Sequence, residues 1–134
     1  YAGSQFGAGA LDPAARFLGL AIFAPENLPK LEAGFREELD RVVKQGFSAD
    51  ELQKGKDGLL QGRQLQRAED QALVSDLAQN AFLGRTLKWD AELEAKIRAL
   101  TPTELNGAVR RHIDPEKFVV VKAGDFKKNT SQQP

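Results

Sequence analysis

The single histidine of the chain, His112, decides whether a metal site is possible. A zinc site needs three or four histidine, cysteine or carboxylate ligands that converge on one point, and the chain has no cysteine. His112 follows Arg110 and Arg111 at the end of an amphipathic stretch, while Asp114 and Glu116 lie past a helix break. We therefore interpret His112 as a helix-end residue that interacts with the helix dipole, and we predict no metal ligand in this chain.

Hydrolysis without a metal would need an activated nucleophile or two suitably spaced carboxylates. Ser4, Ser48 and Ser75 stand outside any nucleophile-elbow pattern, and one histidine disfavours a serine triad. The carboxylates alternate with Lys and Arg, which is typical of solvated helix faces. They are Glu37, Glu38, Asp40, Asp50, Glu51, Glu69, Asp70, Glu92 and Glu94. We predict no catalytic residue.

The early glycines Gly3, Gly7 and Gly9 do not form a phosphate-binding loop, because no strand precedes them and no lysine completes a Walker-type motif. Glycine in a strand more often lets another backbone approach closely. We therefore interpret the three glycines as positions where another backbone can approach the strand closely.

The composition excludes several classes of partner. Charged residues make up 28% of the 134 residues and sum to a net charge of zero, so no basic field attracts nucleic acid or anionic lipid. No apolar run is long enough to cross a membrane. A chain without methionine that starts at Tyr1 is expected to be a fragment. The lack of cysteine suits a periplasmic or a cytosolic protein; we favour the bacterial periplasm and leave the compartment open.

The first quarter of the chain reads as two strands. A weak, glycine-rich strand over 1–10 precedes a turn at Asp12 and Pro13, and the apolar run over 14–24 predicts a strand buried on both faces that pairs with the first. Such a strand needs neighbours on both sides, which we expect upstream or in a partner copy.

Helical patterns follow. Asn27 is expected to cap an amphipathic helix that ends at Gly46, and Ser48 with Glu51 forms a capping box for the next helix. That helix carries three glycines, which require a packing reason or a bend near Arg63. It either ends before the apolar stretch that reaches Gly84 or continues into it as one kinked helix.

The last third of the chain predicts two short helices and a strand. One helix begins at Asp90, and the next begins at the capping box of Thr101 and Glu104 and runs to about Ile113. The run 118–121 then predicts a buried strand. The order of the predicted strands and helices indicates an α+β fold, in which several helices cover one face of an antiparallel-rich sheet. We expect one module over 1–125 and a flexible tail over 126–134.

Several phrases, taken in order, resemble the latter part of a module of the pitrilysin/insulinase family of zinc metallopeptidases and of the related mitochondrial processing peptidases. The resemblance covers nearly the whole chain from Tyr1 to Asp125. It is carried by Ala-Pro-Glu-Asn at 24–27, by Glu-Glu-Leu at 37–39 with Gly-Phe-Ser at 46–48, and by Asp-Pro-Glu-Lys at 114–117 before the strand.

The resemblance implies a two-halved peptidase in which one half binds zinc through a His-x-x-Glu-His helix. This chain has no such motif, but in the family the motif lies upstream of the matching segment, so the start of the chain indicates which half it resembles. That start resembles the non-zinc half, inactive by itself, with the zinc in a partner module of the same or another polypeptide. Tyr1 stands where the non-zinc half has a substrate-binding tyrosine, or the residue just after it, which implies contact with an extended peptide; the alternative is an ordinary residue of the first strand. The alternatives are a structural assembly subunit of the same family and an unrelated helical adaptor.

Overall fold

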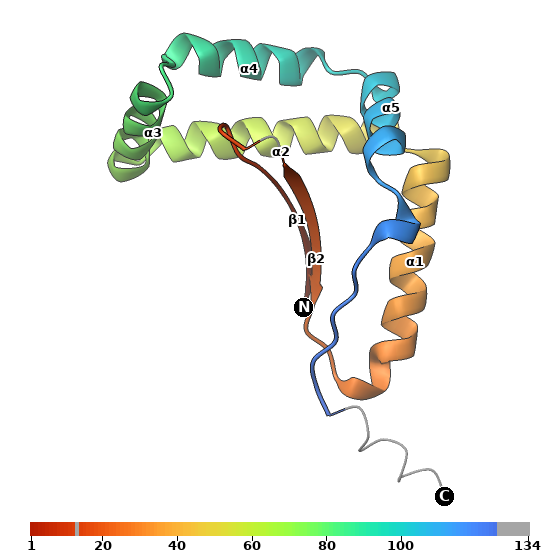
Figure 1. Cartoon of the computed structure of the whole chain (residues 1–134). Coiled ribbons are helices and arrows are strands. Elements are labelled where there is room, and N and C mark those ends of the chain that lie inside the picture. Colours follow the sequence, from red (N-terminus) through yellow and green to blue (C-terminus); the bar gives the residue numbers. More distant parts are fainter. Residues whose placement is uncertain (13, 126–134) are drawn as a thin grey trace, which may run out of the picture. The chain divides into compact units, whose positions relative to one another are not determined.

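The computed structural model describes residues 1–12 and 14–125, and the predicted tail at 126–134 lies outside them. Two strands come first, β1 (Ala2–Ala8) and β2 (Ala15–Ala21), and then helices dominate (Figure 1). These are α1 (Leu28–Gln45), α2 (Ala49–Ala68), α3 (Asp70–Phe82), α4 (Leu87–Ala99) and α5 (Pro102–His112), with 3₁₀ turns η1 (Pro25–Asn27) and η2 (Pro115–Lys117). The broad α+β class is confirmed.

The first two strands form an antiparallel hairpin, as predicted. Phe6 lies opposite Phe17, and Ala2 lies opposite Ala21. At the open end, the Ile22 N–H donates to the Tyr1 carbonyl at 2.8 Å. The hairpin is a sheet of two strands among the described residues, whereas the sequence predicts a larger sheet.

Helix boundaries follow the local signals closely. The Glu51 N–H donates to Ser48 Oγ at 3.2 Å, and the Ser48 N–H donates to the Glu51 carboxylate at 2.8 Å, so the predicted capping box is confirmed. Thr101 and Glu104 form the same motif at the start of α5. Gly46 ends α1 with a φ of +79°, a left-handed conformation that favours glycine.

The structure decides between two alternatives for one helix and corrects the start of another. The helix that begins at Ala49 passes Arg63 without a break and ends at Ala68, and Glu69, in an extended conformation, separates it from α3. The helix predicted from Asp90 begins three residues earlier, at Leu87, with Thr86 as its N-cap. None of the helices that the structure describes has both the length and the apolar character of a membrane span.

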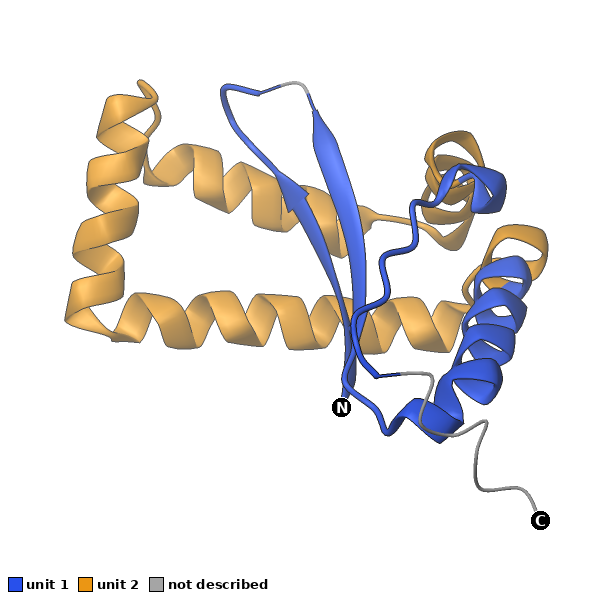
Figure 2. Cartoon of the chain, turned by 60° about the horizontal axis from the view of Figure 1, so that its bottom comes forward, with its two compact units in different colours: residues 1–41, 114–134 blue, residues 42–113 orange. Residues whose placement is uncertain are grey.

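Contacts divide the chain into two units (Figure 2). Unit 1 contains residues 1–41 and 114–134, that is the hairpin, most of α1 and the segment after α5, and unit 2 contains residues 42–113. The boundary falls inside α1.

Aromatic contacts hold unit 1 together. The Phe118 ring lies edge-on to Phe17 at a centroid distance of 5.9 Å and to Phe35 at 6.0 Å. A Cβ atom on Gly19 would lie 3.4 Å from the Phe35 ring, so a helix side chain sits directly on the backbone of β2. Lys122 forms an ion pair with Glu32 of α1. One face of β2 therefore packs against α1 and Phe118.

The opposite face of β2 is open, which corrects the prediction of a strand buried on both faces. Successive side chains of a strand point to opposite faces, so Leu18, Leu20 and Ile22 lie away from Phe17. They are 45%, 56% and 69% exposed. A strand is buried on both faces only when a layer packs against each of them, and the described part of unit 1 supplies a layer on one face alone.

The buried strand predicted for 118–121 is also wrong. This segment follows η2 without strand pairing to any described residue, and Val119 and Val121 are 89% and 86% exposed. Valine and phenylalanine favour strands because they fit a pleated, half-buried surface, and that preference takes effect when a neighbouring edge supplies hydrogen bonds.

Unit 2 combines a small apolar core with buried polar groups. Leu52 is its buried apolar residue, and Asn80 and Glu94 are its buried polar ones. Near the start of α2, the Asn106 side chain accepts from the Phe47 N–H at 2.7 Å and donates to the Phe47 carbonyl at 3.0 Å. This pair of bonds fixes α5 to the turn between α1 and α2.

Candidate functional site

Tyr1 lies at the open end of the hairpin with an exposed side chain. Its main-chain nitrogen donates to the Ile22 carbonyl at 3.0 Å, so the backbone is held in the ladder. The side chain is 82% exposed and its phenol oxygen lies over Gly3, where a Cβ atom would be only 3.0 Å away. The phenol is therefore accessible beside the strand, and substrate binding by Tyr1 stays a prediction.

The hairpin leaves backbone groups of β1 without ladder partners. Residue pairs of an antiparallel ladder alternate between hydrogen-bonded and non-bonded, and Tyr1 with Ile22 is a bonded pair. The N–H and C=O groups of Ala2, Ser4 and Phe6 therefore point away from β2, toward the outer edge. No described residue pairs with that edge.

The side chains along β1 leave room for another backbone. A Cβ atom at Gly7 would meet nothing within 4 Å, and the strand is made of Gly, Ala and Ser apart from Gln5 and Phe6. Open strand edges with unpaired groups are the places where proteins bind extended peptides by adding a strand. The edge of β1 can therefore accept an extended peptide.

His112 is the last residue of α5, the helix-end position that the sequence predicts, and its side chain is exposed. Asp114, two residues later, accepts from the Glu116 N–H at 3.1 Å and pairs with Lys117 at 3.1 Å. Two hydrogen bonds lower the pKa of Asp114. The larger effect comes from the Lys117 side chain, and the smaller comes from the Glu116 N–H. Within residues 1–12 and 14–125, no cluster of three or more His, Cys, Asp or Glu could hold a metal ion.

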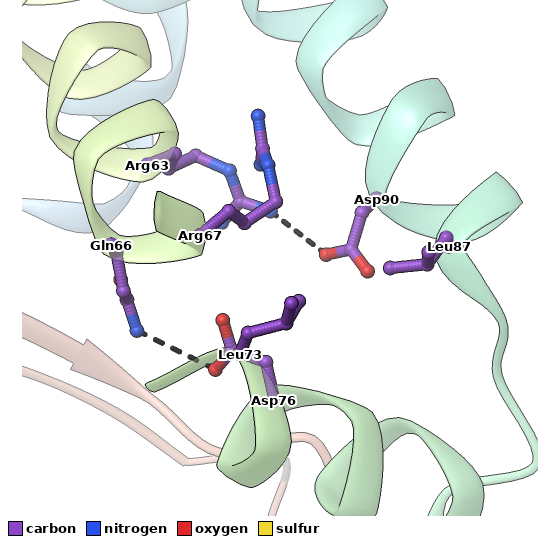
Figure 3. A pocket seen from close by; sticks show the side chains of 7 residues that line it. All are labelled: Arg63, Gln66, Arg67, Leu73, Asp76, Leu87 and Asp90. Carbon is purple, nitrogen blue, oxygen red and sulfur yellow. Dashed lines mark hydrogen bonds and ion pairs between the residues drawn. The ribbon is translucent and has the colours of Figure 1, made fainter. Parts of the chain in front are cut away.

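A charge cluster in unit 2 was not predicted. Arg63 of α2 donates from Nη2 to Asp90 at 2.8 Å and from Nε to Glu94 at 3.2 Å, and Arg67 also bonds to Glu94. Asn80 of α3 donates to the second oxygen of Asp90 at 2.7 Å. The cluster joins three helices and borders a cavity of about 20 Å³, roughly the room of one water molecule (Figure 3).

Glu94 corrects the view that the carboxylates of this chain lie on solvated faces. It is 8% exposed, whereas Glu92 on the same helix is exposed. The pKa of Glu94 is lowered, mainly by the hydrogen bond from Arg67 and further by Arg63. Burial acts in the opposite direction. A carboxylate held ionised between guanidinium groups is a poor general acid near neutrality, so the cluster stabilises the helix packing.

The sequence contains a signal for this cluster. Arg63 and Arg67 are four residues apart on α2, and Asp90 and Glu94 are four residues apart on α4. Residues at this spacing lie on the same helix face, so each pair forms one patch of charge, but the spacing alone does not show that the two patches meet.

No family model, curated protein or solved structure matches this chain. The resemblance to the pitrilysin/insulinase family therefore depends on the motifs quoted above. The open edge of β1 and the exposed phenol of Tyr1 are candidate features on geometry alone.

Proposed function

We propose that this chain is the non-catalytic, substrate-binding half of a zinc-dependent metallopeptidase. Peptide hydrolysis takes place in a separate zinc-bearing module, in the same polypeptide or in a partner subunit. The open edge of β1, beside the exposed Tyr1, supports this proposal because it suits an extended peptide. In this proposal the module has an antiparallel-rich sheet with several helices on one face.

In this proposal the peptide pairs with the outward N–H and C=O groups of Ala2, Ser4 and Phe6. The backbone bonds hold peptides of many sequences, as a substrate-binding surface requires. The phenol of Tyr1 then donates to a peptide carbonyl and orients it for the zinc-bearing module.

The first test measures peptide cleavage by the purified chain alone and after the zinc-bearing module of the same parent protein is added. We expect turnover only in the mixture. Tyr1→Phe removes the phenol oxygen and leaves the main-chain bonds to Ile22, so it should lower turnover in the mixture roughly tenfold. Cleavage by the isolated chain that a chelator abolishes would refute the proposal.

A second test addresses the strand edge directly. Ser4→Pro removes an N–H that points outward, so it should weaken binding of an extended peptide while the hairpin remains. Ser4→Ala keeps the N–H and is the matched control. If neither Ser4→Pro nor Tyr1→Phe changes turnover or peptide binding, the chain is a structural subunit of the assembly instead.

A further inference from the structure

A groove of about 330 Å³ lies in unit 1 between α1 and the segment that follows α5. One wall is a turn and a half of α1, and the other is η2 with the extended chain after it. The lining residues are Phe35, Arg36, Glu37, Leu39, Asp40, Pro115, Glu116, Phe118 and Val120.

The floor of this groove is apolar and held by aromatic contacts. Phe118 packs edge-on against Phe35, and its other edge-on contact, with Phe17, attaches it to β2. Leu39 and Val120 extend the apolar surface. A bulky apolar side chain placed here would remove this surface from water, which stabilises a complex by roughly 25 cal/mol per Å² of apolar area buried.

The rim of the groove is acidic. It carries the carboxylates of Glu37 and Glu116 beside the guanidinium of Arg36; Asp40 also lines the groove but has an interaction of its own. Glu37 and Glu116 form no ion pair with the described residues. The charges of the nearby lysines, Lys117 and Lys122, are already paired with Asp114 and Glu32. Negative potential therefore remains over an apolar floor.

We propose that this groove docks a segment of a partner protein that inserts a bulky apolar side chain flanked by Lys or Arg. The apolar floor takes the anchor, and Glu37 and Glu116 take the flanking cations, so the charge pattern selects a basic segment over an acidic one. A volume of about 330 Å³ is at the lower end for small-molecule pockets, which favours an inserted side chain. The groove is distinct from the β1 edge, so it can be tested independently of the proposed peptidase role.

The probe is a short fluorescent peptide in which Leu and Phe alternate with Lys, and its counterpart has Glu in place of Lys. Fluorescence anisotropy should show that the Lys peptide binds and the Glu peptide does not, with affinity falling as salt rises. The double variant Glu37→Gln/Glu116→Gln should weaken binding about threefold to tenfold, the range expected for two exposed charge pairs. The control Glu26→Gln/Glu92→Gln removes two charges outside the groove and should leave the affinity unchanged.

A second pair of variants tests the floor. Val120 lines the groove and its neighbour Val119 does not, although both are exposed and neither change threatens the fold. Val120→Ser should weaken binding of the Lys peptide, and Val119→Ser should not. The proposal is overturned if the Glu peptide binds equally well, if the two double variants behave alike, or if the two valine variants do.

Discussion

Replacing Glu94 by Gln tests the energetic role of the buried charge cluster most directly. Gln keeps the shape of the side chain and removes its charge, so Arg63 and Arg67 lose their ionised acceptor in a largely buried position. Arg98, a third donor to Glu94 at 3.3 Å, also loses its partner. We expect unit 2 to lose stability while its fold is retained.

The expected loss of unfolding free energy is about 2 kcal/mol. Hydrogen bonds to charged groups contribute about 1.5–3 kcal/mol each, and more when a buried charge is left unpaired. The loss is smaller than the sum over three donors, because the Gln oxygen still accepts a hydrogen bond and Arg63 keeps Asp90 as a partner. Arg98 adds little because its side chain is 59% exposed.

The assay is urea denaturation monitored by the fluorescence of Trp89, the single tryptophan of the chain, which lies on α4 in unit 2. The control is Glu92→Gln, two residues away on the same helix. Glu92 is 58% exposed and reaches Lys88 only at 3.8 Å, so its replacement should change stability by less than about 0.5 kcal/mol. If the two variants differ from the wild type by the same amount, the reasoning about Glu94 is wrong.

The pH dependence provides a second check on Glu94. Its pKa in the folded state lies below the usual 4.5, so the ionised form stabilises the fold above pH 4.5. This contribution is lost as the pH falls through the folded-state pKa. The difference between the wild type and Glu94→Gln should therefore be constant near neutrality and shrink at pH values below 4.5. A difference that grows on acidification would contradict the assignment.

Two further variants test local structure. Gly46→Ala forces a side chain into a left-handed conformation, with its Cβ 2.5 Å from Asn106, and should lower the unfolding free energy by about 2–3 kcal/mol in the same urea assay. A change below about 1 kcal/mol would show that the turn relaxes freely. Thr101→Ala removes a cap and should lower stability by about 1 kcal/mol. Because the Thr101 hydroxyl is the main cause of the lowered pKa of Glu104, that pKa should rise toward 4.5 in an NMR titration, and an unchanged value would exclude the bond.

Much of the fold could be predicted because its signals are local. The two capping boxes, at Ser48 and Thr101, involve residues three apart, and the glycine that ends α1 acts through its own φ. The hairpin was also predictable, because the strands are joined by a short turn. The errors at 18–22 and 118–121 concern burial and strand pairing, which depend on whether another layer or edge lies alongside.

The candidate sites divide in the same way. The sequence predicts that Tyr1 and the early glycines lie on a strand. The outward direction of the Ser4 and Phe6 backbone groups depends on which residue pairs of the ladder are hydrogen-bonded. Only the paired structure decides which pairs those are. The acidic groove needs α1 and Glu116, some eighty residues apart, to lie together.

By itself the sequence determined the residue types available for chemistry, the helix ends and the first strand pair, because each depends on composition or on neighbours within a few turns of chain. The tertiary structure decided that Glu94 is buried between arginines of another helix and that one face of β2 is covered while the other is open. Burial and charge pairing between distant residues depend on how the elements pack, and residue spacing along one chain does not specify that packing.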